Sequence, residues 1–517
     1  MEPDRVGEAE VVLRLSGITK RFGPLIANNA ISFDLHRGEV IALLGENGAG
    51  KTTLMNILFG HYVADEGGVE AFGQRLPEGD PRAALEAGIG MVHQHFTLAD
   101  QMSVLENIAL GTQGIFSLRF DRARALNRIR ELSSSFGLEV DPAATVSNLS
   151  VGERQRVEIL KALYRNARIL ILDEPTAVLT PLETDALFAT LKKLVANGLS
   201  VIFISHKLGE VMAVSDRVLV LRGGRLAGER KTSQTSRSEL AELMVGGEVR
   251  MPKASQAKPG DIVFELRKVC AQARSGARLA DIGFRLHAGE ISGLAGVSGN
   301  GQAALSALLE GTIRPQSGEV IVKGREIVRW SPLEALAHGI GRIPEDRHAT
   351  GMIGDMSVTE NVISEAYRSR RFSRRGILDW KAARDFANAI IRDYEVKCPA
   401  PEARVRLLSG GNMQKLILGR ALEGNPDIIL ANQPTRGLDV GAVAYVHSRL
   451  IEARDRGAAV LLISEDLDEV LALSDRINVI SKGRLSAPFG KGEKSVREIG
   501  ELMAGHGFAD GEAADAA

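Results

Sequence analysis

Short apolar runs alternate with amphipathic stretches along most of this chain. The runs Glu39–Leu44 and Ser200–Ser205 are largely apolar, as strands buried on both faces of a parallel sheet usually are. The stretches between such runs repeat apolar residues at helical spacing, which predicts a mostly parallel sheet flanked by helices. Two further segments, Val11–Leu15 and Ile31–Leu35, alternate apolar and polar residues and predict an antiparallel edge sheet.

Strand signals disappear in two stretches, residues 99–166 and residues 355–425. Helical periodicity dominates both, so each predicts an α-helical subdomain inserted into the α/β pattern. The second stretch contains the arginine-rich run Tyr367–Arg375. A contact with anionic lipid or RNA is one interpretation of this run, and a solvated helix face or loop is the more ordinary one.

The whole pattern occurs twice along the chain. The string GIGMVHQHF at Gly88 recurs as GIGRIPEDR at Gly339, and ILILDEPT at Ile169 recurs as IILANQPT at Ile428. Such a repeat predicts two copies of one α/β domain. We place the domains at residues 1–247 and 261–504, with a polar linker at 248–260 and a tail at 505–517 that is expected to be disordered.

Composition narrows the possible functions. The chain has 517 residues and a formal net charge of −1, from 64 basic and 65 acidic residues, so its charge gives no support for nucleic-acid binding. Two cysteines, Cys270 and Cys398, exclude a disulfide framework and are typical of a reducing compartment. The polar segment Met1–Glu10 does not resemble a signal peptide. No run of about 18 apolar residues occurs, so a role at a membrane requires partner chains.

A phosphate-binding loop follows the first apolar run. Its residues read G-x-x-x-x-G-K-T and are Gly45, Glu46, Asn47, Gly48, Ala49, Gly50, Lys51, Thr52 and Thr53. The glycines allow the backbone to turn its N–H groups inward, where the positive end of the following helix also favours an anion. Lys51 would add a charge at the β- and γ-phosphates, and Thr52 would offer its hydroxyl to Mg²⁺.

Two carboxylates follow a later apolar run, Arg168–Leu172. Charges at the end of a buried strand are costly without a partner, so Asp173 and Glu174 indicate chemistry. Asp173 is suited to holding Mg²⁺ opposite Thr52, and Glu174 to polarising a water at the γ-phosphate. His206 follows the next strand-like run. A single histidine is more often structural. Because His206 is expected at the same sheet edge as Asp173 and Glu174, we interpret it as a γ-phosphate contact.

Three other positions complete the candidate site. Gln94 follows a strand-like run and could contact Mg²⁺ or the attacking water; the flanking His93 and His95 lack a third metal ligand. Phe22 lies in an expected turn and could stack on an adenine ring or simply pack. Ser150, in the string LSVGE, is a candidate N-cap for a helix over Arg154–Tyr164, where its turn also offers backbone donors.

These motifs together resemble the nucleotide-binding subunit of an ATP-binding-cassette transporter, and the likeness extends over both copies. It implies two tandem P-loop NTPase cassettes, bound ATP with Mg²⁺, and ATP hydrolysis coupled to solute transport. The tandem layout is similar to the ATPases of bacterial sugar and nucleoside importers. It further implies two integral-membrane permease subunits, an extracytoplasmic solute-binding protein, and a peripheral location at the cytoplasmic face of the inner membrane, without nucleic acid. The strings MVHQHF, PEDRH and GVSGNGQ are most similar to the nucleoside or simple-substrate branch.

The second copy departs from the family pattern where the chemistry would occur. Gln302 and Ala303 replace the lysine and threonine of the loop. The substitutions at the other polar positions place Glu345 for Gln94, Asn432 for Asp173, Gln433 for Glu174 and Glu465 for His206. The apolar residues around these positions are kept, so we expect this copy to fold and to serve a structural purpose.

In the resembled family, two cassettes pair head to tail around each ATP. The intact loop would then face the turn that contains Ser409, Gly410 and Gly411, with Asp439 nearby. The altered loop would face Ser150, in a turn where Val151 stands at a family glycine and Thr180 stands where Asp439 does. The resemblance therefore predicts one catalytic composite site and one degenerate site. Whether the degenerate site holds a nucleotide stays open, as does the choice of nucleoside, pentose or another sugar as cargo.

Two other classes of protein share some of these features. Soluble tandem-cassette ATPases that act on ribosomes or nucleic acid also have two cassettes, but they usually carry a long charged helical linker and two competent sites. The linker here is about a dozen residues long and one site lacks its lysine. A non-hydrolysing regulatory module is disfavoured by the complete set of polar residues around Glu174.

Overall fold

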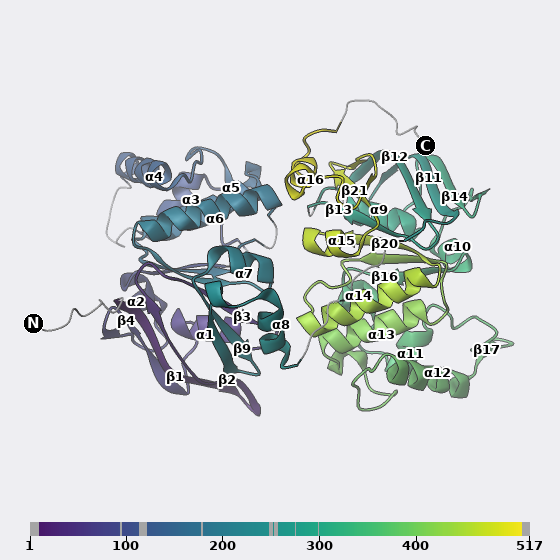
Figure 1. The fold of residues 1–517 in the computed structure, drawn as a ribbon, viewed down its shortest axis with the longest axis horizontal. Helices are drawn as coiled ribbons and strands as arrows, with labels where there is room; N and C mark the ends of the chain where they lie inside the picture. Colours follow the sequence, from purple (N-terminus) through teal and green to yellow (C-terminus); the bar gives the residue numbers. More distant parts are fainter. Residues whose placement is uncertain are drawn as a thin grey trace, which may run out of the picture. The chain divides into compact units, whose positions relative to one another are not determined.

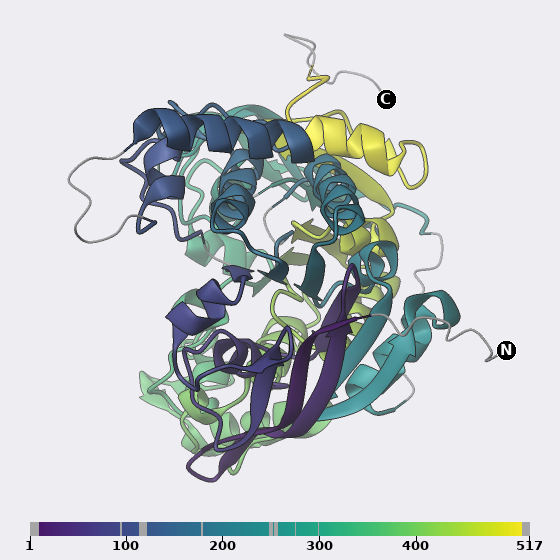
Figure 2. The same ribbon diagram turned by 90° about the vertical axis from the view of Figure 1, so that its left-hand side faces the viewer.

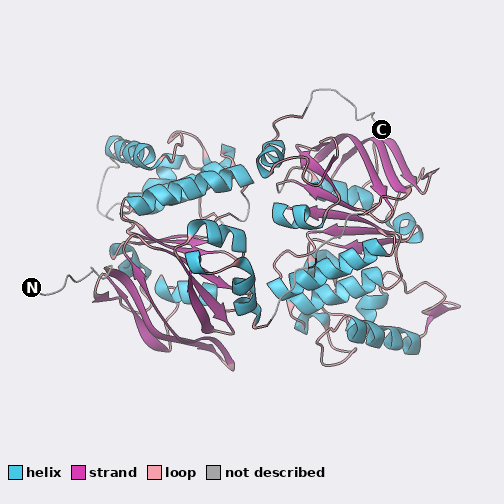
Figure 3. Cartoon of the chain, in the orientation of Figure 1, coloured by secondary structure: helices cyan, strands magenta, loops and turns pink. Residues whose placement is uncertain are grey.

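The computed structural model describes residues 10–93, 96–112, 121–176, 179–247, 252, 257–273, 276–297 and 299–508. Most of the predicted linker, and the predicted tail from residue 509 onward, lie outside the described residues. The chain divides into two compact units, Met1–Val249 and Arg250–Ala517 (Figure 1). Each unit is an α/β structure in which helices flank the strands (Figure 3).

The first unit contains two sheets. Its strands are β1 (Val11–Phe22), β2 (Leu25–His36), β3 (Val40–Gly45), β4 (Glu66–Ala71), β5 (Gln74–Arg75), β6 (Ile89–Val92), β7 (Ile169–Asp173), β8 (Ser200–Ile204), β9 (Arg217–Arg222) and β10 (Arg225–Lys231). One sheet has the order β2-β1-β4-β5 and is antiparallel. In the other, of order β10-β9-β3-β8-β7-β6, only β10 runs antiparallel to its neighbour.

Burial explains why the apolar runs form the central strands. Every residue of β3 and β8 is buried, and Ile41, Leu170 and Phe203 are each 0% exposed. A strand buried on both faces requires an almost continuous apolar run, as these strands have. The alternating segments form β1 and β2, whose antiparallel register pairs Leu15 with Phe33. The predicted fold class is therefore confirmed.

The helices of the first unit begin at recognisable caps. They are α1 (Lys51–Leu58), α2 (Pro81–Glu86), α3 (Val104–Ala109), α4 (Arg122–Phe136), α5 (Val151–Tyr164), α6 (Pro181–Ala196), α7 (Leu208–Val214) and α8 (Arg237–Val245), with short 3₁₀ turns at Val146–Asn148 and Thr232–Gln234. Ser103, Ser150 and Thr180 each close a capping box with a glutamate three residues later. Figures 1 and 2 both show α3, α4 and α5 at one end of the unit and the antiparallel strands at the other.

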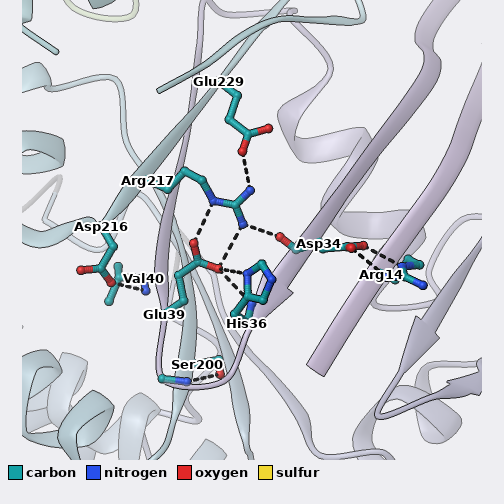
Figure 4. A network of polar contacts seen from close by, with 10 residues as sticks. Arg14, Asp34, His36, Glu39, Val40, Ser200, Asp216, Arg217 and Glu229 are labelled. Carbon is teal, nitrogen blue, oxygen red and sulfur yellow. Dashed lines mark hydrogen bonds and ion pairs between the residues drawn. The ribbon is translucent and has the colours of Figure 1, made fainter. Parts of the chain in front are cut away.

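A polar network joins the two sheets of the first unit (Figure 4). Arg217 on β9 donates two hydrogen bonds to Glu39, at 2.8 and 3.0 Å, one to Glu229 at 2.6 Å, and one to the carbonyl oxygen of Asp34 on β2 at 2.5 Å. Glu39 also accepts from the backbone N–H of His36 at 2.9 Å. Burial alone would raise the pKa of Glu39, but the hydrogen bonds from Arg217 and His36 outweigh it and lower that pKa. The network fixes the start of β3, which leads into the phosphate loop.

The second unit repeats this architecture with more strands. They are β11 (Ile262–Gln272), β12 (Arg278–His287), β13 (Ile291–Ala295), β14 (Ser317–Val322), β15 (Arg325–Glu326), β16 (Ile340–Ile343), β17 (Ser373–Arg374), β18 (Ile377–Leu378), β19 (Ile428–Asn432), β20 (Ala459–Ser464), β21 (Arg476–Ser481), β22 (Arg484–Leu485) and β23 (Phe489–Gly490). The antiparallel sheet has the order β12-β11-β14-β15. The larger sheet has the order β16-β19-β20-β13-β21-β22, with β23 also paired to β21.

The helical subdomain of the second unit differs from its prediction in one respect. The unit's helices are α9 (Gln302–Leu309), α10 (Pro332–Ala337), α11 (Val358–Ile363), α12 (Trp380–Asp393), α13 (Gly410–Leu422), α14 (Val440–Asp455), α15 (Leu467–Leu473) and α16 (Val496–Met503), with a π turn at Arg347–Gly351 and a 3₁₀ turn at Val405–Leu407. Between α11 and α12 the chain forms the small hairpin β17–β18, where only helical signals were expected. Strands of two residues are too short to produce a periodic pattern.

No helix among the described residues is both long enough and apolar enough to cross a membrane. The hydrophobic core of each unit consists of separate clusters of buried, mainly aliphatic side chains on the two sides of its larger sheet.

Candidate active site

The phosphate loop joins β3 to α1 in the first unit. Gly50 lies at the N-cap of α1 with a φ of 100°, and no side chain caps this helix. A Cβ at Gly50 would collide with the carbonyl oxygen of Ala27 and with the side chain of Asn28, so the position requires glycine. Because the first turn of α1 lacks a side-chain cap, its backbone N–H groups are available to an anion.

Lys51 lies beneath the loop and is only 7% exposed. Its Nζ donates hydrogen bonds to the carbonyl oxygens of Gly45, at 2.6 Å, and Glu46, at 3.1 Å. Burial lowers the pKa of Lys51, and the charges of Glu174 and Asp173 oppose that shift without cancelling it. The lysine predicted to contact phosphate therefore lies within the electrostatic reach of both predicted acids.

Asp173 and Glu174 lie where β7 ends. Burial and the neighbouring Glu174 charge raise the pKa of Asp173, while Lys51 opposes the shift. Glu174 has a φ of 46°, in the left-handed region that a non-glycine residue adopts only at a cost. Its backbone N–H donates to the carbonyl oxygen of Ile204 on β8 at 2.9 Å, which fixes this conformation.

His206 contacts Glu174 directly. The distance from Nδ1 of His206 to Oε1 of Glu174 is 2.9 Å, and the imidazole side chain is 45% exposed. Burial would raise the pKa of Glu174, but the hydrogen bond and charge of His206, together with Lys51, lower it overall. Glu174 is therefore ionised at neutral pH and can accept a proton or orient a water.

A second polar layer, which the sequence did not reveal, lies behind these residues. Glu210 on α7 accepts hydrogen bonds from Thr176 at 2.6 Å and from Ser205 at 2.9 Å. Ser205 in turn accepts from the backbone N–H of Lys207 at 3.0 Å. These bonds join the loop after β7 to the loop after β8, the two loops that carry Glu174 and His206. The only signal in the sequence was a hydroxyl residue just after each of two strands, Thr176 in Glu-Pro-Thr and Ser205 in Ser-His-Lys.

Phe22 occupies the last position of β1, so its expected place in the turn was wrong. Its ring is 44% exposed and contacts Tyr62 edge to face, with centroids 5.8 Å apart. Lys20 lies 5.6 Å from the centre of the same ring. Phe22 is therefore free to offer a face to a planar ligand. Tyr62, itself 42% exposed, is a second aromatic residue that the sequence analysis did not select.

For the other residues of the predicted site, the structure gives less information about a role. Thr52 is exposed in the first turn of α1, and Thr53 beside it is half-buried. Gln94 and His95 lie outside the described residues. His93 stacks on His61 with ring centroids 6.4 Å apart, and burial followed by the charge of His61 lowers its pKa. Among the described residues, no cluster of three or more His, Cys, Asp or Glu side chains is placed to hold a metal.

The second unit keeps the backbone of the site but not its charges. Gly301 is the N-cap of α9 with a φ of 115°, again without a side-chain cap. Gln302 occupies the position of Lys51, is 6% exposed, and has no hydrogen-bond partner for either atom of its amide among the described residues. Gln433, at the position of Glu174, has a φ of 48°, and its N–H donates to the carbonyl oxygen of Ile463 at 2.8 Å.

Polar side chains around the phosphate loop of the second unit form hydrogen bonds with one another. Asn432 donates to Ser306 at 3.2 Å, and Ser306 donates to Glu310 at 2.9 Å. The backbone N–H of Glu465, at the position of His206, donates to Oε1 of Gln433 at 3.3 Å. The amide of Gln433 cannot act as a general base at neutral pH, so this arrangement has the shape of the first site without its acid–base chemistry.

The two serine turns differ in how the serine is used. In the first unit, Glu153 accepts from the Ser150 hydroxyl at 2.8 Å, and Ser150 caps α5 by accepting from the N–H of Glu153 at 3.3 Å. In the second unit, Ser409 makes no cap hydrogen bond to α13. Its Oγ accepts from Asn412 at 2.9 Å, and no acceptor for its own proton is found in the described part of the chain. Ser409 therefore keeps a hydroxyl proton for a ligand.

This combination of phosphate loop, buried lysine, strand-end carboxylates and histidine defines a nucleotide-hydrolysing cassette, present here in two copies of unequal chemistry. A family model described as ABC transporter matches residues 28–177 and 279–436. The chain belongs to the ABC transporter family, and it is an ATPase.

Known relatives are similar over almost the whole chain. The nucleoside import ATP-binding protein NupA of Lactococcus lactis subsp. cremoris (strain MG1363) is 42% identical, and the alignment covers 96% of this chain and 98% of that protein. The guanosine import ATP-binding protein NupO of Bacillus subtilis (strain 168) is 44% identical over the same shares. The glucose import ATP-binding protein TsgD13 of Haloferax volcanii is 42% identical, with 97% of each chain covered.

A solved structure, titled RNase-L Inhibitor, resembles this chain with a TM-score of 0.61 and 19% identity, covering 92% of this chain and 90% of that one. At that identity the likeness concerns the fold alone.

Proposed function

We propose that this chain is the ATP-binding and hydrolysing subunit of a bacterial importer, and that it powers uptake of a nucleoside or simple sugar through separate membrane subunits. The observation that carries the proposal is the contact between Glu174 and His206 beside the buried Lys51. The relatives described above are named as import ATP-binding proteins, which supports the transport assignment. Residues 1–247 form the first cassette and residues 261–504 the second, joined by the linker 248–260.

In the proposed reaction, the first unit binds ATP and prepares a water for attack. The N–H groups of the loop and Lys51 hold the phosphates, and Phe22 stacks on the adenine. Mg²⁺, when bound, neutralises charge on the phosphate oxygens; Thr52, Asp173 and Gln94 are the residues that would hold it. Two observations indicate that these residues suit a magnesium ion. The hydroxyl of Thr52 lies in the first turn of α1, and the carboxylate of Asp173 lies close enough to Lys51 to interact with its charge.

Glu174 supplies the base in this proposal. Its lowered pKa keeps the carboxylate ionised, so it can orient the attacking water and accept its proton. His206 positions that carboxylate through Nδ1 and, being partly exposed, leaves its other ring nitrogen for the γ-phosphate. The charge of Lys51 then stabilises the phosphate oxygens as the bond to the leaving group lengthens.

We further propose that Ser409, Gly410 and Gly411 of the second unit complete this site across a head-to-tail pair of cassettes. The uncommitted hydroxyl proton of Ser409 supports that role, since a phosphate oxygen is a strong acceptor. The opposite pairing would bring the altered loop to Ser150, whose hydroxyl is already bonded to Glu153. One catalytic and one degenerate site follow from this difference.

The membrane subunits are proposed to dock in a groove beside Gln94 on the first unit and beside Glu345 on the second. A cavity of about 320 Å³ supports the first location; its lining includes Phe59, His61, Met91, His93, Glu158 and Lys161. On the second unit, Arg342 pairs with Glu310 and Glu365, each at 3.3 Å. One docking location on each unit would serve two membrane subunits, with a solute-binding protein outside selecting the cargo. The chain would thus be peripheral, on the cytoplasmic face.

The proposal is tested by copurification and by solute-stimulated turnover. Membrane proteins encoded beside this chain should copurify with it, and ATP turnover of the reconstituted complex should rise with a nucleoside and its binding protein. A rise with a pentose or hexose instead would change the cargo and keep the importer. Turnover stimulated by ribosomes or nucleic acid, with no membrane partner recovered, would overturn the proposal.

A further inference from the structure

The hairpin between α11 and α12 is rich in arginine. Its strands pair Ser373 with Leu378 and Arg374 with Ile377, and the turn between them contains Gly376 with a φ of 83°. Figure 1 shows β17 projecting beyond α12 at the edge of the unit. The hairpin is held at its base by Phe372, which is 2% exposed and contacts the ring of Phe386 on α12 at 5.2 Å.

The arginines of this hairpin are exposed and have no carboxylate partner among the described residues, although Arg371 also lies over the ring of Phe386, 4.3 Å from its centre. They are Arg368, Arg370, Arg371, Arg374 and Arg375, and all five are exposed. The segment from Ala366 to Leu378 contains no acidic residue. None of the five arginines takes part in an ion pair with another described residue, whereas Arg384 and Arg392 on the following helix both do. Uncompensated positive charge is concentrated here although the chain as a whole has a formal charge of −1.

Apolar side chains are exposed among these charges. Ile377 is 74% exposed, Trp380 at the start of α12 is 49% exposed, and Tyr367 is 43% exposed. Removing this apolar surface from water would be favourable. Arginine, tryptophan and tyrosine around an apolar tip are the side chains that favour the interface between a membrane and water.

We propose that this hairpin, residues 366–380, binds the headgroups of anionic phospholipids, with Ile377 and Trp380 entering the interface. Guanidinium groups match phosphate oxygens through paired hydrogen bonds, and each basic residue strengthens attraction to an anionic leaflet. RNA would also satisfy the arginines, but it would leave Ile377 in water, so the observations favour a membrane. Glu365, one residue before the hairpin, pairs with Arg342 at 3.3 Å, near the location proposed for docking of a membrane subunit. The proposed function would therefore bring the hairpin near the bilayer.

The first unit provides a comparison within the same chain. Its corresponding segment, residues 113–120, reads QGIFSLRF and carries a single arginine. That segment lies outside the described residues. By sequence alone, lipid binding of this kind is expected from the second unit only.

The test is cosedimentation of the purified full chain with vesicles. Binding is expected to vesicles of equal parts phosphatidylcholine and phosphatidylglycerol, to be weak with phosphatidylcholine alone, and to fall as salt is raised. The triple variant Arg370→Gln/Arg374→Gln/Arg375→Gln should weaken binding roughly a hundredfold, at about fivefold per arginine. Ile377→Ser should weaken it by about tenfold, through loss of the inserted apolar surface.

The matched control removes the same charge elsewhere. Arg122, Arg124 and Arg130 are exposed on α4, and Arg122→Gln/Arg124→Gln/Arg130→Gln should leave vesicle binding within about twofold of the unchanged chain, since none of these arginines belongs to the hairpin and charges farther than a Debye length from the bound lipid are screened. Thermal unfolding and ATP binding by the first unit confirm that each variant is folded.

The proposal is overturned if the unchanged chain ignores anionic vesicles, if both triple variants lose binding equally, or if the hairpin variants lose binding to an RNA probe and not to vesicles. These outcomes are separate from the importer proposal. A chain that failed to bind lipid could still copurify with membrane subunits and hydrolyse ATP.

Discussion

Nδ1 of His206 lies 2.9 Å from Oε1 of Glu174 in the first unit. The same two positions in the second unit hold Glu465 and Gln433, and there the backbone N–H of Glu465 donates to the amide oxygen of Gln433 at 3.3 Å. The backbone at Glu174 and Gln433 is alike, with φ values of 46° and 48°. The two units thus share a scaffold and differ in the side chains that can move a proton.

Replacing the proposed base tests its role. Glu174→Gln should lower steady-state phosphate release by about 10²–10⁴, as loss of a general base does, and leave ATP binding nearly unchanged. The second unit already accommodates glutamine at this backbone conformation, so the variant is expected to fold. Phosphate release and equilibrium binding of ATP measure the two effects.

The matched variant is Gln433→Ala, which should leave phosphate release within about twofold of normal, because an amide there supplies no base. If Glu174→Gln hydrolysed ATP at the normal rate, Glu174 would lose the role assigned to it.

Removing the aromatic ring of Phe22 should weaken only that part of ATP binding that comes from the adenine base. Phe22→Ala is expected to raise the Kd for ATP about tenfold, which corresponds to losing one aromatic stack. The Kd for inorganic triphosphate should not change, because that ligand has no adenine. An equal loss for both ligands would show that Phe22 supports the loop and does not stack on the base.

The network around Glu39 should make the stability of the first unit depend on pH. The pKa of Glu39 lies below its ordinary value of 4.5, so its contribution is complete above that value and disappears as the pH falls through the lower, folded-state value. Glu39→Gln should therefore destabilise the protein by about 2 kcal/mol at neutral pH, through charged hydrogen bonds lost to Arg217.

The difference in unfolding free energy between the chain and Glu39→Gln should shrink as the solution is acidified below pH 4.5. Denaturant unfolding at several pH values measures it. Arg14→Ala, which breaks the solvent-exposed ion pair of Arg14 with Asp34, is the comparison and should change stability little. A difference that grew on acidification would contradict the direction of the Glu39 shift.

The sequence predicted those parts of the fold that leave a continuous apolar pattern. Strands such as β3 and β8 are buried throughout, so their apolar runs were unmistakable. The hairpin β17–β18 was missed because each strand has two residues and none of them is buried. Phe22 was assigned to a turn because its glycine and proline neighbours gave a turn signal one residue early.

The candidate site was predictable where one motif contains all the information. Lys51 and Gly50 belong to one loop, where Gly50 is the N-cap of α1 and Nζ of Lys51 donates to the carbonyl oxygen of Gly45. The contact between Phe22 and Tyr62 joins residues far apart in sequence, and no local pattern encodes it. The difference between the serine turns could have been found, because S-x-x-E is a capping box and S-x-x-N is not.

The most direct test of the unequal sites compares Ser409→Ala with Ser150→Ala in the same ATP hydrolysis assay. The account predicts that Ser409→Ala lowers turnover by roughly 10- to 100-fold, through loss of a hydrogen bond to a charged phosphate. Ser150→Ala should keep turnover near normal and cost only the helix cap, about 1 kcal/mol of stability. Equal losses, or a larger loss from Ser150→Ala, would contradict a single catalytic site completed by the second unit.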